Sequence, residues 1–364
     1  QTCALPILDL KGSSAQAQHC CLRKSFTKID ITKNFWFNEQ FQPLRQLNLE
    51  NKWDPQCNNC RQLEELNLPS FRTGTNDGLG IYGKTDLTGP VRLDLMFDIS
   101  CNLACRTCGP HSSTYWQKHL KENNRWDKPV FAPRKKDEVI SALSNIDLSN
   151  LRMLVFCGGE TLLGQEYWDV AEWISNQVPD AKKNLTLCFQ TNGTQEIHPK
   201  NYKIIDKFFL VKLHVSLDGT EDQFEYLRWP ASWAQVVDNL NTIKDTAPSN
   251  LMFLIEETIS IFNLPYINRL DGWVKQNFTT NRERDIVNHT RHFAHGIFSL
   301  SSMSSEYADA MLNTKYKNFV PENFKENNNL ISTMLSEIKK YDQYRNQDFT
   351  KTFPLLADYY AKWL

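Results

Sequence analysis

The feature that constrains this chain most is a group of three cysteines, Cys101, Cys105 and Cys108, spaced C-x3-C-x2-C. The group directly follows an apolar, strand-like segment at residues 91–97. A compact loop with this spacing can turn three thiolates toward one centre, and a cubane 4Fe–4S cluster takes its protein ligands from cysteine. Three ligands for four irons leave one iron open to a small molecule. The spacing also fits a zinc site in which His111 is the fourth ligand.

The composition is that of an ordinary globular protein. Of the 364 residues, 41% are hydrophobic and 23% are charged, which allows two or three domains with a substantial core. The formal net charge is −1, so the charge balance gives no reason to expect binding to nucleic acid or to an anionic membrane. No apolar run in the sequence is long enough to cross a membrane.

The use of cysteine favours metal binding over disulfides. The chain has ten cysteines, most of them in tight clusters or in an ordered set. The opening residues show neither the charged segment nor the cleavage site of a signal peptide, so we expect none. In a chain that is not secreted, clustered cysteines favour metal, and we expect a reducing, cytoplasmic location.

A second group of cysteines lies near the N-terminus. Cys57 and Cys60 form a C-x2-C pair that runs into a helical segment, as in many metal knuckles. Together with Cys3 and either Cys20 or Cys21, the pair would complete a four-cysteine site. In the alternative interpretation, Cys3 and one of the two adjacent cysteines are only small buried hydrophobic residues.

The hydrophobic pattern predicts strands that alternate with helices from about residue 91 onward. Strands are expected at 91–97, 151–156, 185–190, 208–216, 251–261 and 285–289. Helices are expected at 111–120, 138–146, 165–176, 231–246 and 265–276. This alternation predicts βαβ units and a parallel sheet. From about residue 303 the pattern is helical, and we expect its aromatic residues to pack this tail onto the rest of the chain.

The pattern before residue 91 is less regular. Residues 1 to about 30 predict a hairpin with its turn at residues 11–14, and a helix is expected at about 41–49. The glycine-containing segment 76–83 predicts a linker or turn.

Small polar or glycine-rich turns follow the first four strands of the alternating region. The first strand leads into the three-cysteine loop, and the next three lead into the turns at residues 157–161, 190–194 and 216–219. Ligands bind beyond the carboxyl ends of parallel strands, so these turns are expected to meet at one mouth if the sheet curves. This convergence favours the iron–sulfur interpretation over the zinc site.

These turns supply candidate ligand-binding residues. Gly158 and Gly159 lack side chains, so backbone can approach a ligand there, and Glu160 can accept a hydrogen bond from an ammonium group. Asn192 and Ser216 carry amide and hydroxyl groups suited to a ribose or a carboxylate. Each of these motifs alone is more often a turn or a loop cap.

Arg228, in the segment Glu-Tyr-Leu-Arg-Trp-Pro at 225–230, is a candidate for binding a ligand carboxylate. The alternative for this residue is an ordinary ion pair on the protein surface.

Taken together, the motifs carry a family resemblance. C-x3-C-x2-C, Gly-Gly-Glu at 158–160, Thr-Asn-Gly at 191–193 and Val-Ser-Leu-Asp-Gly at 215–219 resemble, in order and spacing, the radical SAM superfamily. The N-terminal cysteines resemble the pattern of its SPASM/twitch auxiliary-cluster modules. The chain looks most like the twitch-domain radical SAM proteins that place this module before the core, and the resemblance covers roughly residues 1–300.

The resemblance implies two metal sites. A 4Fe–4S cluster with an open iron for S-adenosylmethionine would be held by Cys101, Cys105 and Cys108. A second, auxiliary 4Fe–4S cluster would be held by Cys3, Cys20, Cys57 and Cys60.

The resemblance also assigns roles around S-adenosylmethionine. Glu160, with Gly158 and Gly159, would meet the methionine amino group. Ser216 and Asn192 would face the ribose or the carboxylate, and Arg228 the carboxylate. An electron from a reductant such as flavodoxin or ferredoxin would release a 5′-deoxyadenosyl radical, which would take hydrogen from a substrate.

Three features depart from the family pattern or lie outside it. Thr107 stands where many members carry an aromatic residue near the adenine, and a missing stacking face costs on the order of 1 kcal/mol. The N-terminal hairpin lacks the usual acidic-glycine turn, which leaves the choice between Cys20 and Cys21 open, with Cys20 preferred by position. Cys157 and Cys188 lie on or beside core strands and are expected to be buried and unreactive.

The sequence therefore predicts an α/β protein, a partial (β/α)6 TIM-like barrel with a small N-terminal iron–sulfur module and C-terminal helices. The expected divisions are 1–85 for the module, 86–300 for the core and 301–364 for the helices. The expected activity is radical SAM chemistry on a substrate that is a peptide in our leading interpretation. The alternatives are a nucleoside or small metabolite as substrate, or a non-catalytic zinc or iron–sulfur interaction module.

Overall fold

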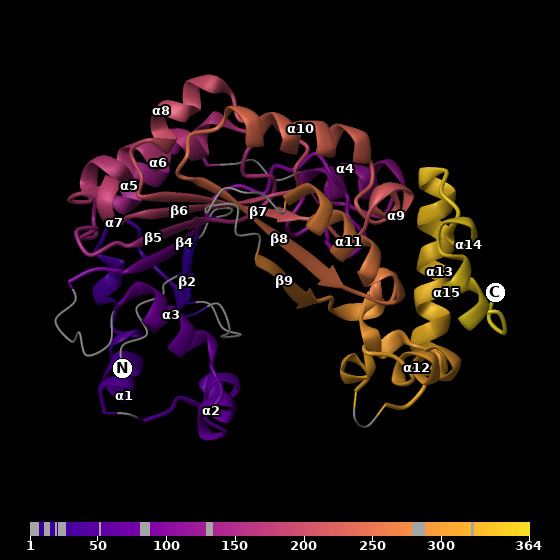
Figure 1. Ribbon diagram of the computed structural model, residues 1–364. Coiled ribbons are helices and arrows are strands. Elements are labelled where there is room, and N and C mark those ends of the chain that lie inside the picture. The colour runs from indigo at the N-terminus through magenta and orange to yellow at the C-terminus, as the bar shows by residue number, and fades with distance from the viewer. Residues whose placement is uncertain are drawn as a thin grey trace.

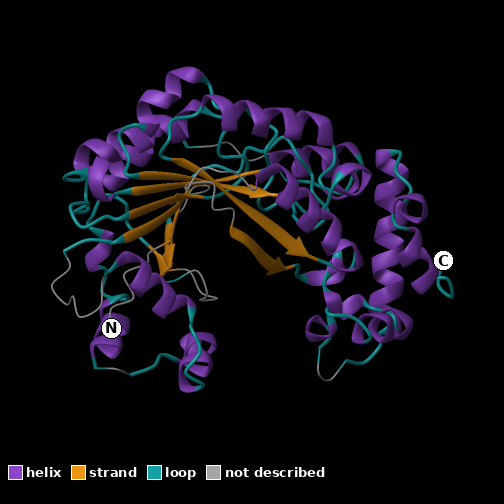
Figure 2. Ribbon diagram, viewed as in Figure 1, coloured by secondary structure: helices purple, strands orange, loops and turns teal. Residues whose placement is uncertain are grey.

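The structure is a computed structural model that describes residues 7–10, 15–18, 20, 27–50, 52–80, 88–128, 134–278, 288–321 and 324–364. One curved sheet runs through the molecule and is covered on one face by helices (Figures 1 and 2). Its strands, within the described residues, are β1 (Ile7–Asp9), β2 (Gln16–Gln18), β3 (Thr27–Lys28), β4 (Arg92–Met96), β5 (Met153–Phe156), β6 (Thr186–Thr191), β7 (Leu210–Ser216), β8 (Leu251–Ile259) and β9 (Asn288–Phe293).

The order of strands in the sheet is β3-β2-β1-β4-β5-β6-β7-β8-β9. β1 pairs with β4, and β4 through β9 pair with one another, in parallel fashion. Among the described strands, the antiparallel pairs are β1 with β2 and β2 with β3. Because successive strands from β4 onward are neighbours joined through helices, their carboxyl ends lie along one edge of the sheet. The predicted α/β fold with a parallel, partial-barrel sheet is confirmed.

The helices come between and after the strands. They are α1 (Gln42–Leu49), α2 (Asn58–Glu65), α3 (Phe71–Leu79), α4 (Thr114–Glu122), α5 (Lys136–Leu143), α6 (Gln165–Gln177), α7 (Ala181–Asn184), α8 (Tyr202–Ile205), α9 (Glu221–Leu227), α10 (Trp233–Thr246), α11 (Ile267–Phe278), α12 (Ser305–Leu312), α13 (Asn328–Arg345), α14 (Phe349–Thr352) and α15 (Pro354–Tyr359). No helix in the described ranges has the length and apolar character needed to span a membrane.

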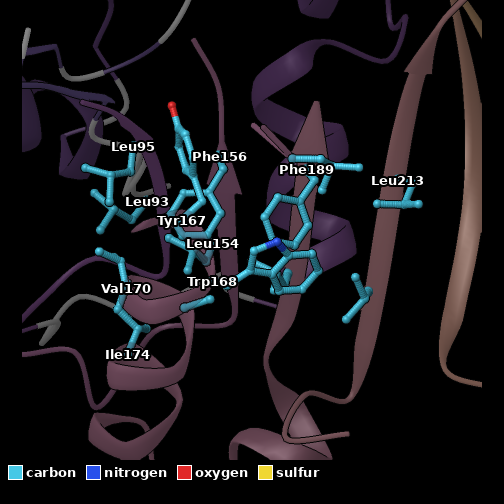
Figure 3. Packing of buried hydrophobic residues seen from close by; sticks show 14 of the residues in the cluster. Leu93, Leu95, Leu154, Phe156, Tyr167, Trp168, Val170, Ile174, Phe189 and Leu213 are labelled. Carbon is cyan, nitrogen blue, oxygen red and sulfur yellow. The ribbon is translucent and has the colours of Figure 1, made fainter. Parts of the chain in front are cut away.

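Helix α6 shows how the sequence pattern builds the main core. Its buried residues Tyr167, Val170 and Ile174 recur at helical spacing, so they form one face that packs on the sheet (Figure 3). The ring of Trp168 lies 4.5 Å from that of Phe189 on β6. Burying a large apolar side chain in this way stabilises the fold by about 1.5–3 kcal/mol.

The N-terminal segment shares this core. Residues of β1 pair with β4, and Leu8, Phe35, Trp36 and Phe41 belong to the same apolar cluster as the central strands. The predicted hairpin is present as the antiparallel pair of β1 and β2, while its turn at 11–14 lies outside the described residues. The boundary of an N-terminal module at residue 85 stays a prediction.

The structure corrects one expectation in this region. The segment that begins at residue 76 was expected to be a linker or turn, but Asn76, Asp77 and Gly78 belong to α3. Ser70 starts this helix with a capping box to Thr73, and Gly80 ends it with φ +60. The start and stop signals therefore outweigh the low helix propensity of the glycines inside.

The last strand also differs from its expected position. β9 spans Asn288–Phe293, four residues beyond the predicted end, and residues 285–287 of the prediction lie outside the described residues. Its alternation of polar and apolar residues is weak, so pairing with β8 rather than periodicity decides where it lies.

The C-terminal helices form a second apolar cluster. Tyr307, Tyr360 and Phe353 are buried there together with Tyr226 of α9 and Phe262, which follows β8. Tyr307 donates a hydrogen bond to the carbonyl of Ile261 at 3.0 Å. The prediction that the aromatic residues pack this tail onto the rest of the chain is confirmed.

Candidate functional site

The three-cysteine loop leaves the end of β4 and is clamped from two sides. The backbone N–H of Cys101 donates to the hydroxyl of Thr114 at the start of α4, at 3.1 Å. On the other side the N–H groups of Ala104 and Arg106 donate to the carbonyls of Trp229 and Leu227, each at 2.8 Å. The loop is therefore held in place by its own backbone before any ligand is considered.

The three thiols influence one another. Cys101 and Cys105 are half-buried and Cys108 is exposed. Burial raises the pKa of Cys101 to about 11, and the neighbouring Cys108 adds to this effect. Burial likewise raises the pKa of Cys105, with further contributions from Cys108 and Cys101 and an opposing one from Arg228. Thiols whose pKa is raised by burial and by neighbouring thiols need a cation or a metal before all of them ionise.

The donor set fits a cubane better than a single zinc ion. Within the described ranges, no three Cys, His, Asp or Glu side chains gather closely enough to hold one metal ion. His111, the fourth ligand of the zinc alternative, is exposed. A cubane binds each thiolate at a different iron, so its three ligands need not converge on one point.

The second strand-end turn packs directly against this loop. A Cβ at Gly159 would lie 2.1 Å from the carbonyl oxygen of Ser100, and one at Gly158, whose φ is +136, would lie 2.2 Å from that of Asp98. The N–H of Glu160 donates to the same Ser100 oxygen at 2.7 Å. The glycines thus allow a close approach between two backbones, while approach of a ligand to them stays a prediction.

Glu160 ties the second strand end to the third. Its carboxylate is buried and accepts hydrogen bonds from the hydroxyl of Thr191 at 2.7 Å and from the N–H groups of Asn192 at 2.6 Å and Leu162 at 3.0 Å. Burial raises the pKa of Glu160 although these bonds oppose the shift. A carboxylate offers about four acceptor positions, so about one is left for an ammonium group.

Asn192 brings the third strand end to the cysteine loop. Its Nδ2 donates to Asn102 Oδ1 at 3.0 Å and lies 3.9 Å from the sulfur of Cys101. Its Oδ1 accepts from the N–H of Thr194 at 2.9 Å. The amide is therefore fixed beside one of the three thiols.

Arg228 and Asp218 form a buried pair beside a second thiol. Arg228 Nη2 lies 2.9 Å from Asp218 Oδ2, and Nη1 lies 3.8 Å from the sulfur of Cys105. Both residues are at least nine-tenths buried, so the alternative of a surface ion pair is wrong. The buried Nε of Arg228 has no hydrogen-bond partner among the described residues, which suits the expected contact with a ligand carboxylate.

Ser216 ends β7 and is half-buried, with a group of ionisable residues on the same face of the sheet. His214, two residues earlier, lies with its Nδ1 2.6 Å from Glu256 Oε1 on β8, and His292 Nε2 lies 3.9 Å from the same oxygen. Burial opposes ionisation of both members of the pair, but their contact lowers the pKa of Glu256 to about 2. Contacts with the Cys188 thiol and with Glu256 raise the pKa of His214 to about 9 against the effect of burial.

Sequence reasoning did not find this group, nor the contact that Arg106 makes inside the cysteine loop. The Arg106 guanidinium is buried, donates to Asp342 Oδ1 of α13 at 2.5 Å and lies over the ring of Tyr226 at 3.7 Å. The only local signal for Arg106 was a basic residue between two cysteine ligands. Its partner on α13 is 236 residues away in sequence.

The remaining predicted residues are placed as follows. Cys3 and Cys21 lie outside the described residues. Cys20 is buried against Phe71 and Leu79, Cys57 is half-buried directly before α2, and Cys60 is buried within α2. The four-cysteine site stays a prediction.

Two isolated cysteines differ from each other. Cys188 is buried as expected, but Cys157, which directly follows β5, is only half-buried. Its sulfur lies 3.7 Å from the carbonyl oxygen of Leu95. Thr107, the position without a stacking ring, is half-buried.

Comparison with known proteins bears on this site. Residues 99–262 match the family model described as Radical SAM superfamily, and this range contains the cysteine loop and the turns that pack on it. This part of the chain is similar to a radical SAM domain. The match supports an enzyme of that class, and the family implies a 4Fe–4S cluster and S-adenosylmethionine. No curated protein matches the sequence.

Solved structures similar to the chain include two with bound ligands. One, described as native anSMEcpe with bound AdoMet, is 18% identical, with a TM-score of 0.42, over 69% of this chain and 60% of that chain. Another, described as Streptococcus suis SuiB bound to precursor peptide SuiA, is 12% identical, with a TM-score of 0.36, over 98% of this chain and 75% of that chain. The match thus spans 60% of the length of the first structure, and likenesses at these TM-scores decide neither fold nor activity.

Proposed function

We propose that the chain is a radical SAM enzyme that cleaves S-adenosylmethionine reductively and uses the radical to abstract hydrogen from a substrate. One observation carries the proposal. The turns that follow β5, β6 and β7 all contact the three-cysteine loop, through Glu160, Asn192 and the pair of Arg228 with Asp218. Ligand-binding groups and cluster ligands therefore share one edge of the sheet.

The residues of the chain would divide the work of holding the two cofactors. Cys101, Cys105 and Cys108 would bind three irons of a 4Fe–4S cluster. With the bound cluster, S-adenosylmethionine supplies the 5′-deoxyadenosyl radical after transfer of one electron from a reductant such as flavodoxin or ferredoxin. The polypeptide would bind and orient the two cofactors and keep water away from them.

Three groups are suited to S-adenosylmethionine. The free acceptor position of Glu160, beside the Gly158–Gly159 backbone, would take the methionine ammonium. The unpartnered Nε of Arg228 would donate to the carboxylate. Ser216 and Asn192 would meet the ribose or the carboxylate.

We propose that the substrate is a peptide and that an auxiliary 4Fe–4S cluster is bound by Cys3, Cys20, Cys57 and Cys60. In this proposal residues 1–85 form the auxiliary module of twitch or SPASM type, 86–300 the radical SAM core and 301–364 a helical extension, in a protein of the reducing cytoplasm. A nucleoside or small metabolite is the alternative substrate. Products formed from host-cell extract with S-adenosylmethionine would distinguish these classes directly, because a modified peptide and a modified nucleoside differ in mass and fragmentation.

Reconstitution without oxygen tests the proposed activity. Two cubanes correspond to about eight irons per chain, and the loaded protein should convert S-adenosylmethionine to 5′-deoxyadenosine when a reductant is present. Full iron loading without 5′-deoxyadenosine would refute the proposed enzyme. Protein that retains zinc and no iron would favour the non-catalytic interaction module instead.

A further inference from the structure

Arg345, the last residue of α13, carries a buried charge that the proposed reaction has not used. The residue is 6% exposed, and none of its guanidinium nitrogens has a hydrogen-bond partner within the described part of the chain. Burial, and next the nearby Arg106, lower its pKa to about 9, which leaves it protonated at neutral pH. An isolated buried cation is unfavourable, so an opposing charge is expected close by.

A carboxylate on the same helix does not fill that role. Asp342 lies one turn earlier on α13, but its Oδ1 accepts from Arg106 at 2.5 Å and from the hydroxyl of Tyr226 at 2.8 Å. Its Oδ2 accepts from the N–H of Phe349 at 2.7 Å. Arg106 thus occupies this carboxylate, and the positive charge of Arg345 is left without a hydrogen-bonded carboxylate among the described residues.

The surroundings of Arg345 are three aromatic rings. Its guanidinium carbon lies 4.7 Å from the ring centre of Trp116, 5.0 Å from that of Trp229 and 4.9 Å from that of Tyr341. The negative faces of these rings offset part of the cost of burial and hold the charge in place.

Two of these rings belong to residues that also hold the cysteine loop. The indole N–H of Trp116 donates to the carbonyl of Cys105 at 2.9 Å, and the carbonyl of Trp229 accepts from the N–H of Ala104 at 2.8 Å. The Cys105 thiolate is among the groups that favour the charged form of Arg345. The guanidinium therefore lies directly behind the loop that carries the cluster ligands.

We propose that Arg345 is a positioning residue that raises the reduction potential of the core cluster by placing an uncompensated positive charge beside it. This inference rests on the proposed function, because it requires a cluster on Cys101, Cys105 and Cys108. Reduction adds one electron from an external reductant to a centre that already carries three thiolates, and no bond or proton changes place. Net charge near a cluster is one of the properties that set its potential.

The expected size of the effect can be stated as a ratio. At a separation of about 10 Å and an effective dielectric constant of about 20, a unit charge changes the ratio of reduced to oxidised cluster by roughly tenfold. For a one-electron couple, tenfold corresponds to about 59 mV.

A redox titration followed by electron paramagnetic resonance tests the inference on the full-length, reconstituted protein. The signal that changes when S-adenosylmethionine is added reports the core cluster. Arg345→Met should make the midpoint potential of this signal more negative by about 59 mV, which corresponds to the tenfold ratio given above. Arg345→Lys keeps the charge, so the midpoint potential of its core cluster should stay closer to the wild-type value.

A reciprocal variant separates charge from structure. Asp342→Asn removes the carboxylate that neutralises Arg106, so it should move the midpoint in the positive direction. General damage to the loop would move both variants the same way. Arg125→Met is the matched control, because Arg125 also lies near Tyr341 but forms a partly exposed pair with Glu337 at 2.8 Å. The midpoint potential of the core cluster in Arg125→Met should equal that of the wild type.

The outcomes are distinguishable. Opposite shifts in Arg345→Met and Asp342→Asn support the inference. Equal midpoints in wild type and Arg345→Met, with the cluster loaded, would overturn it and leave Arg345 a structural cation. If Arg345→Met loses its cluster, the direction of the Asp342→Asn shift decides. Wild-type protein without any cluster that responds to S-adenosylmethionine would refute the proposed function and the inference with it.

Discussion

Replacing Gly159 by alanine perturbs the contact on which the site depends. The added Cβ would lie 2.1 Å from the Ser100 carbonyl oxygen, and real Cβ atoms essentially never show distances under 3.0 Å. The turn and the loop must therefore separate by at least about 0.9 Å, the difference between these two distances. Nothing nearby can yield cheaply, because the atoms in contact belong to the backbone of Ile99 and Ser100.

The energetic cost follows from this displacement. The hydrogen bond from Glu160 N–H to Ser100 is 2.7 Å long, and an added 0.9 Å stretches it to about 3.6 Å, where it no longer counts as a hydrogen bond. Loss of that bond costs about 1 kcal/mol. Overpacking of a tight contact adds about 1–3 kcal/mol, so the total is about 2–4 kcal/mol.

The loop can relieve this strain by moving, which would misplace the thiol of Cys101. We expect Gly159→Ala to unfold at a lower temperature and to lose the iron of the core cluster after reconstitution. The assays are thermal unfolding, iron per chain and 5′-deoxyadenosine formation. Gly272→Ala in α11 is the matched control, because its Cβ would meet nothing within 4 Å. It should stabilise the protein by up to about 1 kcal/mol.

Two results would refute this reasoning. Gly159→Ala that loads iron and forms 5′-deoxyadenosine like the wild type would show that the close backbone contact does not position the cysteine loop. A loss of activity as large in Gly272→Ala would show that the assay reports general damage.

Two further predictions concern buried and half-buried carboxylates. Glu160→Gln replaces one acceptor oxygen by an amide N–H₂, which then faces either the Asn192 N–H or the Thr191 hydroxyl. The substitution should therefore destabilise the fold by about 1–3 kcal/mol and weaken binding of S-adenosylmethionine, as measured by urea unfolding and calorimetry. The pair of His214 and Glu256 should make stability depend on pH. Since the pKa of His214 is raised to about 9, its contribution is complete below pH 6.5 and lost as the pH rises to about 9. The contribution of Glu256, whose pKa is lowered to about 2, is complete above pH 4.5 and lost as the pH falls toward 2. Wild type should therefore lose on the order of 2 kcal/mol between pH 6 and 9 relative to His214→Asn, and equal pH profiles would contradict the pairing.

Much of the fold could be predicted because local pattern and tertiary structure agree. The alternation of apolar runs and turns placed β4 through β8 within a few residues, since strands buried under helices must be continuously apolar. The helix at 71–79 was missed because a capping serine and a terminal glycine decide it, while its interior glycines suggest a turn.

Only those parts of the candidate site that lie at strand ends could be predicted from the sequence. Parallel topology brings the turns after β5, β6 and β7 to the cysteine loop whatever their side chains are, so their convergence follows from the pattern. The internal bonds of Glu160 and Arg228 could not be predicted, because a carboxylate or guanidinium suited to a ligand is equally suited to a neighbouring turn. The link from Arg106 to Asp342 has no local signal, since only the folded chain brings α13 to the loop.

The central claim is that this loop binds the cluster that cleaves S-adenosylmethionine. The most direct measurement compares 5′-deoxyadenosine formed by reconstituted Cys105→Ala and Cys188→Ala with that of the wild type. Cys188 is buried in β6 and is not assigned to either cluster, so its variant should retain the cleavage and all of the iron. Cys105→Ala should form no 5′-deoxyadenosine and keep about half of the iron, the share of one of two cubanes. Unchanged 5′-deoxyadenosine formation in Cys105→Ala would contradict the account.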